Sequence, residues 1–273
     1  GIRDCSVQRD KQKILEESGS TMLSDELEKV VLRSTRSIAE QVGYVGAGTV
    51  EFIYDLKSNA VYFMEMNTRL QVEHPVTELV SGVDIVGEQF RIASGESISS
   101  LKEEHEGYAI EVRINAELIE KSGDGKLNFK PQPGRILDCE FPDQQNIEVI
   151  STAGSGKEVS PYYDSLLAQV IVHSSTRETA IDELVEYLDR VKLTGVSTNI
   201  PLLKLVLRDK VFREGRYDTG YLLELLDRSD VEVLISEMID AAGTKNLGID
   251  SGKIAIDGTD ELRVLSPSSA IFY

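Results

Sequence analysis

The sequence has little positive charge. It contains 29 Lys and Arg against 47 Asp and Glu, a formal net charge of -18, and no stretch rich in Lys or Arg. A surface of this sign repels a phosphate backbone. We therefore expect no nucleic-acid partner.

Long hydrophobic runs are also missing. None approaches the roughly 20 apolar residues that span a bilayer, and the N-terminus lacks the charged-then-apolar pattern of a signal peptide. We expect a soluble, cytoplasmic protein without a membrane partner, or, in a eukaryote, a protein of an organelle such as the mitochondrion or plastid.

Cysteine and histidine are scarce. Cys5 and Cys139 lie far apart in a chain of 273 residues, 41% of them hydrophobic, which can bury a core without a disulfide. Free thiols are expected, and no His or Cys pair has the spacing of a zinc site. The chain begins at Gly1 without a Met, in mid-pattern, which suggests that it is excised from a longer one.

Apolar spacing and cap residues predict an α+β fold. The predicted helices cover residues 24–42, 84–93, 180–191 and a segment from about 198. Runs of β-branched and aromatic residues predict strands at 49–54, 60–66, 109–116, 134–139, 147–151 and 168–172. The first two strands form a hairpin, and the others form an antiparallel sheet with helices on one face.

Changes in polarity predict the domain boundaries. Residues 97–107 are polar and separate a first domain, 1–100, from a second, 101–224. An acidic helix over 227–243 and a linker over 244–261 then make up a segment of residues 225–262.

The hairpin carries acidic residues in a pattern that suits a metal ion. Side chains two apart share a face of a strand, so Glu65 and Asn67 lie on one side while Met64 and Met66 point to the core. Pairing brings Glu51 to the same surface, which gives the hard oxygen ligands that Mg²⁺ or Mn²⁺ prefers. The alternative is a solvated acidic face.

A possible anion clamp follows the hairpin directly. Arg69, Gln71 and Glu73 lie on a segment that Pro75 stiffens. A cation site beside an anion clamp suggests phosphoryl transfer to an anionic acceptor.

Several motifs resemble one family. The string FMEMNTRL at 63–70 looks like the signature of ATP-grasp ligases, and EMNTRLQVEHPVTE at 65–78 resembles biotin carboxylases in particular. RDCSVQR, GYVGAGTVEF, EVRINAE, PGRI, PYYDSLL and TGVSTNIPLL match in family order, from Arg3 to about Leu223. The resemblance implies the C-terminal half of an ATP-grasp domain, then the biotin carboxylase C-terminal domain, then a helical linker.

The resemblance assigns roles to the hairpin and the clamp. Two divalent ions, Mg²⁺ or Mn²⁺, held by Glu51, Glu65 and Asn67, would bridge the ATP phosphates. Bicarbonate would be bound by Arg69, Gln71 and the backbone at Val72, and Glu73 would be the general base that removes its proton. Carboxyphosphate forms and releases CO₂.

Further positions follow from the same resemblance. Gln8 and Ile53 would lie near the nucleotide, as would Lys11, although Asp10 and Lys11 replace the Arg and His of most relatives. Arg113 would stabilise the enolate-like biotin that attacks CO₂, the alternative being an ion pair with Glu111.

Two motifs remain ambiguous. Tyr162, Tyr163 and Asp164 either line the biotin side of the cleft or pack as an aromatic turn at the edge of the sheet. Residues 263–273 resemble the opening strand of a biotinyl carrier domain, with Ala270 in place of the usual Gly.

The resemblance implies a biotin carboxylase portion of an acyl-CoA carboxylase, with acetyl-CoA as acceptor in fatty acid synthesis. Its partners would be ATP, bicarbonate, a biotinyl carrier domain, a carboxyltransferase domain or subunit and a second copy in a homodimer. Without the family's N-terminal ATP-binding parts, we expect the isolated chain to be inactive. The alternatives are another ATP-grasp ligase, such as a carbamoyl phosphate synthase, and a non-catalytic dimerisation scaffold.

Overall fold

The structure is a computed structural model that describes residues 1–9, 11–98, 101, 105–121, 127–228 and 231. The predicted helix over 227–243, the linker over 244–261 and the carrier-like strand in 263–273 lie outside these residues, apart from residues 227, 228 and 231. Among the helices that the structure describes, none is long and apolar enough to cross a bilayer.

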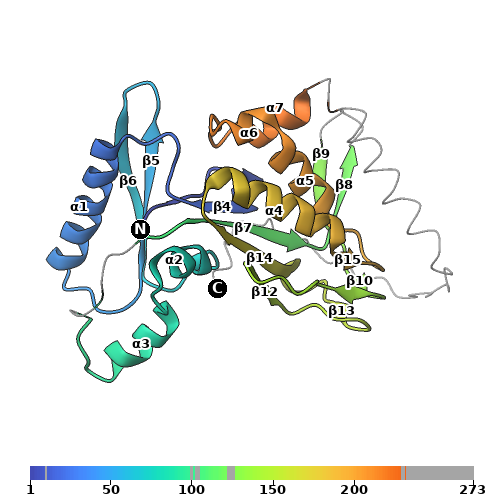
Figure 1. Ribbon diagram of the computed structural model, residues 1–273, viewed down its shortest axis with the longest axis horizontal. Coiled ribbons are helices and arrows are strands. Elements are labelled where there is room, and N and C mark those ends of the chain that lie inside the picture. Colours follow the sequence, from blue (N-terminus) through green and yellow to red (C-terminus); the bar gives the residue numbers. More distant parts are fainter. Residues whose placement is uncertain (10, 99–100, 102–104, 122–126, 229–230, 232–273) are drawn as a thin grey trace, which may run out of the picture.

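A five-stranded antiparallel sheet forms the centre of the molecule (Figure 1). In spatial order its strands are β1 (Arg3–Asp4), β4 (Leu15–Ser18), β7 (Tyr108–Asn115), β14 (Leu166–Ser174) and β12 (Ile147–Ser151). The sequence predicts the last three but not β1 and β4. The N-terminal segment therefore joins the sheet of the predicted second domain.

One face of this sheet carries the main hydrophobic core. Ile110, Val112 and Ile114 of β7 point to it and pack with residues of four helices. These helices are α4 (Arg177–Arg190), α5 (Ile200–Arg208), α6 (Lys210–Arg213) and α7 (Tyr221–Asp227). Thr176 caps α4 and Pro201 lies in the first turn of α5, which agrees with the predicted helices.

The opposite face packs against the short helix α2 (His74–Ser81). Val76 and Val80 of α2 form a small apolar cluster with Ala109 and Ile171. Alternation along β7 places Glu111 and Arg113 on this same face. The face that carries Arg113 thus lies against the start of α2.

The hairpin of β5 (Thr49–Asp55) and β6 (Ala60–Asn67) forms a separate two-stranded sheet at the side of the molecule (Figure 1). Glu51 pairs with Glu65 and Thr49 with Asn67 in its register. The predicted inward orientation of Met64 is wrong, because its side chain is 47% exposed. The register shifts between Glu51 and Phe52, so a strict two-residue alternation fails at Met64.

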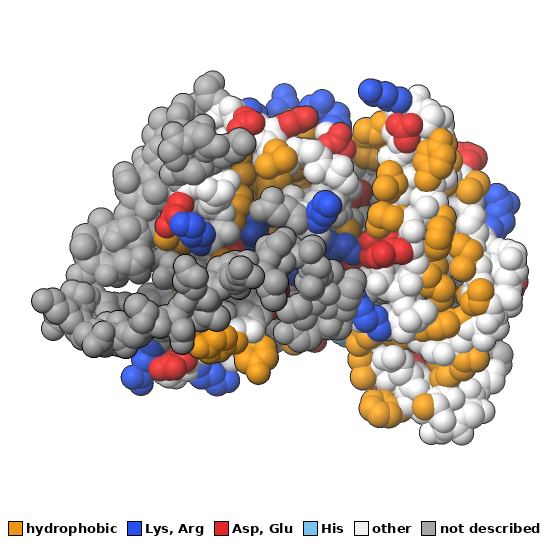
Figure 2. Space-filling view, turned by 180° about the vertical axis from the view of Figure 1, so that it is seen from behind, with side chains coloured by type: hydrophobic (Ala, Val, Ile, Leu, Met, Phe, Trp, Pro, Cys, Tyr) orange, Lys and Arg blue, Asp and Glu red, His pale blue; other side chains and the backbone are white. Residues whose placement is uncertain are grey.

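Two further helices, α1 (Asp25–Gln41) and α3 (Ile85–Ala93), lie on the same side of the molecule as the hairpin (Figure 1). We call the hairpin and these two helices the hairpin lobe. Ser24 caps α1 as the sequence predicts, and Asp84, predicted as the first residue of its helix, caps α3. Among the residues described, α1 has none that is fully buried. Figure 2 shows hydrophobic side chains gathered on the right of its view, which is this lobe. The most exposed large ones there are Val42, Val45, Ile53, Tyr62, Phe63 and Phe90.

Short strand pairs complete the described structure. They are β2 (Gln8–Arg9) with β3 (Gln12–Lys13), β8 (Glu117–Lys121) with β9 (Leu127–Pro131), β10 (Gly134–Arg135) with β13 (Glu158–Val159), and β11 (Cys139–Glu140) with β15 (Lys192–Leu193). The single strand predicted at 134–139 is wrong, because β10 and β11 pair with different partners.

Candidate active site

The three predicted metal ligands converge on one surface of the hairpin. The Asn67 side-chain nitrogen lies 3.1 Å from a carboxylate oxygen of Glu51 and 3.1 Å from one of Glu65. The register that pairs Glu51 with Glu65 produces this convergence, since directly opposite residues project to the same face.

Glu51, Glu65 and Asn67 can supply some, but not all, of the ligands of a divalent cation. The Asn67 amide presents Nδ2 to both carboxylates, and turning the amide would offer Oδ1 and give three oxygen donors. Within the described part of the chain, no group of three His, Cys, Asp or Glu residues could hold a metal ion. The residues therefore suit Mg²⁺, which takes one or two carboxylates and completes its shell with water and substrate oxygens.

Lys13 of β3 connects Glu51, one of the predicted metal ligands, to Glu73. Its ammonium lies 3.2 Å from the Glu51 carboxylate and 2.8 Å from that of Glu73. The Gln71 amide also donates to Glu51, at 2.9 Å. Glu51 is thus held by three donors, two of which come from outside the hairpin.

Glu73 lies at the N-terminal boundary of α2 and has a side chain only 3% exposed. Pro75 in the first turn fixes where the helix begins, so the carboxylate is oriented by the backbone. Burial by itself raises the pKa of Glu73, but Lys13 and Arg113 outweigh it and lower the pKa to about 2. The carboxylate is therefore ionised and able to accept a proton.

Arg113 of β7 lies beside Glu73 at 3.0 Å and also forms an ion pair with Glu16 of β4. Its guanidinium is 3.9 Å from Glu111, so the predicted alternative of a simple pair with Glu111 describes only its weakest contact. Although burial alone lowers the pKa of Arg113, the surrounding carboxylates raise it further above its usual value. The guanidinium stays charged.

The remaining clamp residues are close by. Gln71 accepts a hydrogen bond from Arg3 at 3.1 Å, and the Val72 carbonyl accepts one from Gln169 at 2.7 Å. Arg69 is half-buried and donates to the Leu70 carbonyl at 3.1 Å. Residues 69–73 are thereby fastened to both the N-terminal segment and the central sheet.

The three residues predicted to lie near the nucleotide, Gln8, Lys11 and Ile53, have different surroundings. Gln8 is paired with Lys13 in the β2–β3 register, and Ile53 lies on β5, two residues from Glu51, with its side chain 55% exposed. Lys11 occupies the turn between β2 and β3 with φ 68° and is exposed. Gln8 is thus the register partner of Lys13 and Ile53 follows Glu51 along β5, whereas Lys11 lies in the exposed turn.

Sequence reasoning missed several members of this network, namely Arg3, Lys13, Glu16 and Gln169, and named Glu111 only as a possible partner of Arg113. The only available signal is the string ILEES at 14–18, in which two acids interrupt a short apolar run. All four residues of β4 are buried, so these acids need partners inside the protein.

The turn at Tyr162 and Tyr163 is not packed. Their side chains are 88% and 74% exposed, so the predicted aromatic packing is wrong for the described residues. Asp164 accepts from Gln12 at 3.4 Å and from the backbone of Leu166 at 2.8 Å. Asp164, which follows the two exposed rings in the chain, thus contacts β3.

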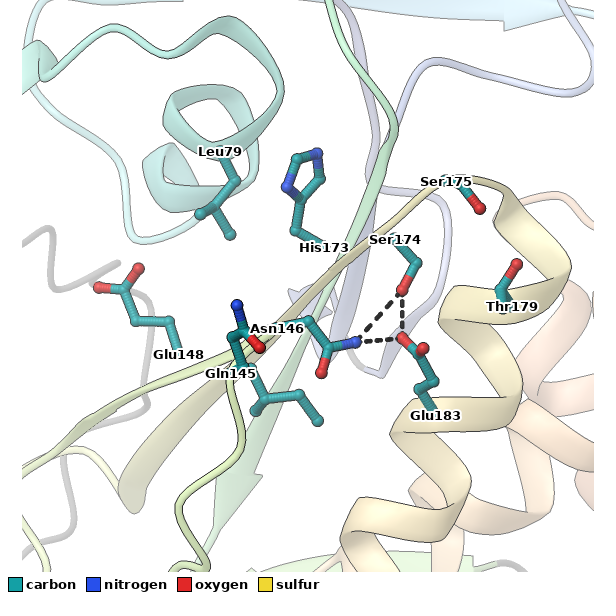
Figure 3. Close-up of a pocket in the computed structure, with 10 residues that line it drawn as sticks. Leu79, Gln145, Asn146, Glu148, His173, Ser174, Ser175, Thr179 and Glu183 are labelled. Carbon is teal, nitrogen blue, oxygen red and sulfur yellow. Dashed lines mark hydrogen bonds between the residues drawn. The ribbon is translucent and has the colours of Figure 1, made fainter.

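A polar groove of about 560 Å³ lies elsewhere, between α2 and the ends of β12 and β14 (Figure 3). The Glu183 carboxylate in it accepts hydrogen bonds from Asn146 and Ser174. No side chain singled out from the sequence lines this groove, and Glu148 and Glu183 make it acidic. It does not suit a phosphate or bicarbonate anion.

Two family models match the chain. The model described as "Carbamoyl-phosphate synthase L chain, ATP binding domain" matches residues 1–101, and "Biotin carboxylase C-terminal domain" matches residues 111–224. An ATP-binding domain match followed by this second match places the chain in the ATP-grasp class of proteins.

Curated relatives identify the family. Biotin carboxylase 1 of Bacillus subtilis (strain 168) is 45% identical over 224 residues, which is 81% of this chain and 48% of the relative. The 2-oxoglutarate carboxylase small subunit of Hydrogenobacter thermophilus is 45% identical over 226 residues, 82% of this chain and 46% of the relative. The chain belongs to the biotin carboxylase family and spans about half the length of the curated relatives it matches.

Solved structures agree. The biotin carboxylase domain dimer of the Hydrogenobacter thermophilus 2-oxoglutarate carboxylase, in complex with MgADP, ADP and bicarbonate, gives a TM-score of 0.75 at 43% identity. The match covers 83% of this chain and 50% of that solved chain. The urea carboxylase of Kluyveromyces lactis gives a TM-score of 0.74 at 36% identity, over 81% of this chain and 19% of that protein. The predicted fold class and family are thus confirmed.

Proposed function

We propose that this chain forms the metal-binding and bicarbonate-binding part of an enzyme that carboxylates protein-bound biotin at the expense of ATP. Glu51, Glu65 and Asn67 would hold Mg²⁺, or Mn²⁺, which neutralises charge on the ATP phosphates during phosphoryl transfer. These three side chains would thus carry the metal-dependent part of the reaction.

Bicarbonate would bind between Lys13 and the 69–73 segment. Arg69 and Gln71 supply donors on this segment, and Glu73 lies at its end, 2.8 Å from Lys13. An anion drawn to Lys13 and Arg113 would weaken their hold on Glu73, whose pKa would then rise from about 2 toward its ordinary value. Glu73 becomes a stronger base at the moment that its substrate arrives.

Arg113 would serve the second half of the reaction. Its permanent charge suits the delocalised oxyanion that biotin develops when it attacks CO₂. Because Arg113 and Lys13 are bridged by Glu73, the site for bicarbonate and the site for biotin share one carboxylate. This bridge is the observation that carries the proposal.

The alternatives fit this arrangement less well. A carbamoyl phosphate synthase has no use for Arg113 within EVRINAE, and the match over residues 111–224 is to the biotin carboxylase C-terminal domain. A pure scaffold gives no reason for Lys13, Glu73 and Arg113 to form buried ion pairs beside the hairpin carboxylates. Dimerisation as a second role is compatible with catalysis.

Partners and acceptor remain proposals. We propose ATP, bicarbonate, a biotinyl carrier and a carboxyltransferase as partners, a homodimer as the assembly, and the cytoplasm or an organelle as the location. Acetyl-CoA is our proposed acceptor, although relatives named for 2-oxoglutarate and for pyruvate match at similar identity. The chain alone should bind metal and bicarbonate without measurable ATP turnover, since it spans about half of these relatives.

Titration of the chain with ¹³C-bicarbonate, followed by NMR, tests the proposal. Arg69→Ala should weaken binding about 10-fold or more, because a hydrogen bond to a charged group contributes about 1.5 to 3 kcal/mol. Arg208→Ala is a matched control, since Arg208 pairs with Asp189 on the far helices. Equal affinity in the wild type and Arg69→Ala would remove bicarbonate from the proposed site.

A further inference from the structure

Two buried carboxyl groups lie directly opposite each other in the central sheet. Glu16 of β4 and Glu111 of β7 are register partners, and both side chains are 0% exposed. Opposite residues in an antiparallel pair have Cβ atoms about 4.5 to 5.5 Å apart, so two ionised carboxylates here would repel each other strongly. The proposed mechanism uses neither of them.

Around Glu16 and Glu111, carboxyl groups outnumber positively charged side chains. The other charged groups on this face are Arg113 of β7, Glu73 at the start of α2, Lys13 of β3 and Arg3 of β1, which acts on Glu73. The Cys5 thiol also faces Glu16, and burial raises the pKa of this thiol, so it is neutral. Gln169 of β14 is the polar neutral neighbour, and its amide donates to Glu111 at 3.1 Å. Together with Glu51, four carboxyl groups therefore share three cations, and one of these, Lys13, contacts both Glu51 and Glu73.

One oxygen of each carboxyl group is left over. Glu16 uses one oxygen for Arg113, and Glu111 uses one for Gln169. The second oxygens, Glu16 Oε2 and Glu111 Oε2, are fully buried and have no hydrogen-bond partner among the described residues. A proton on one of them would supply the missing donor and remove the excess negative charge.

The partners of the pair lead to both sides of the proposed substrate site. Through Arg113, Glu16 acts on Glu73, whose carboxylate lies 3.0 Å from the guanidinium. Through Gln169, Glu111 acts on the Val72 carbonyl, 2.7 Å from the same amide nitrogen. Among the described contacts, Glu16 and Glu111 reach the proposed substrate site only through Arg113 and Gln169, and neither contacts Glu51, Glu65 or Asn67.

We propose that Glu16 and Glu111 share one proton and act together as positioning residues for Arg113 and the 72–73 segment, so that their protonation is coupled to bicarbonate binding. With one proton shared, the face carries equal numbers of positive and negative charges. Loss of that proton adds a buried negative charge next to the anion site and disfavours bicarbonate. Burial is the main cause that raises the pKa of Glu16 to about 7, and it raises that of Glu111 as well.

The first experiment needs no substrate. In the full chain with ¹³C-labelled glutamate side chains, NMR should show a carboxyl group that titrates near pH 7. Glu16→Gln and Glu111→Gln should each move this titration to lower pH, because the repulsion between the two acids is removed while burial and Arg113 remain. Glu17→Gln is the matched control, since Glu17 is equally buried in β4 but pairs with Arg177 on the other face. A wild-type chain in which every carboxyl group titrates below about pH 6 would overturn the shared proton, whether or not the variants fold.

The second experiment rests on the proposed function. Bicarbonate affinity of the wild type should fall about 5-fold or more between pH 7 and pH 8.5, a typical coupling between sites, and should stay flat in Glu111→Gln. A merely structural pair would leave the same pH profile in both proteins, which contradicts the coupling. If the wild type binds no bicarbonate, the proposed function fails, and the carboxyl titration still decides whether the proton is shared.

Discussion

The substitution Glu73→Gln tests the buried ion pairs at the heart of the site. The structure lowers the pKa of Glu73 from 4.5 to about 2, with its side chain 3% exposed. At 1.36 kcal/mol per pH unit this corresponds to about 3 kcal/mol of folding free energy. Because the pKa of this acid is lower in the folded state, the stabilisation is present above pH 4.5 and is lost as the pH falls toward 2.

Urea unfolding of both proteins at several pH values measures this contribution. At pH 7 the variant should be less stable by about 3 kcal/mol, and its Tm lower by about 6 to 12 °C. The difference should shrink below pH 4.5. Glu65→Gln is the control, because Glu65 is exposed and accepts only from Asn67 among the contacts described, so its stability should match the wild type. A Glu73→Gln protein as stable as the wild type at pH 7 would refute the reasoning.

Three further substitutions separate other parts of the account. Lys13→Gln removes a cation that lies 3.2 Å from Glu51. Mn²⁺ affinity measured by calorimetry should therefore rise about 3-fold, while bicarbonate affinity should fall about 10-fold. A change of both affinities in the same direction would contradict the geometry. Glu65→Gln should weaken Mn²⁺ binding about 10-fold or more, and unchanged affinity would remove Glu65 from the metal site. Gly195→Ala should destabilise the chain by about 2 to 4 kcal/mol in urea unfolding, because φ is 93° and a Cβ would lie 2.3 Å from the Arg135 carbonyl oxygen. Gly43→Ala, at φ 59° in open space, is its control and should cost about 1 kcal/mol; equal losses would exclude a steric effect at Gly195.

Local patterns predict the parts of the site that are close in sequence. The hairpin register that joins Glu51 to Glu65 follows from two short β-rich runs around a turn, and the structure confirms it. Helices α1, α3, α4 and α5 follow from apolar spacing, caps and proline, and their bounds agree within a few residues. The irregular register at Met64 has no local signal, because a bulge depends on the partner strand.

The buried charge network has no such signal. Lys13, Glu16 and Arg113 come from segments far apart in the chain, and only the β4–β7 pairing brings Glu16 to Arg113. Acidic residues in a short strand also indicate an exposed edge by composition alone, whereas β4 is fully buried. The pairing of β4 with β7 decides both the Glu16–Arg113 contact and the burial of β4, and the residue pattern within one strand does not encode this pairing.

The most direct test of the whole account places the metal and the anion in one experiment. Relaxation of ¹³C-bicarbonate bound to the chain should be strongly enhanced by Mn²⁺, because the Glu51–Glu65–Asn67 cluster and the 69–73 segment are joined through Gln71 and Lys13. The enhancement should disappear in Glu65→Gln while bicarbonate still binds. Bicarbonate that binds with no Mn²⁺ enhancement in the wild type would contradict the claim that these residues form a single metal-and-bicarbonate site.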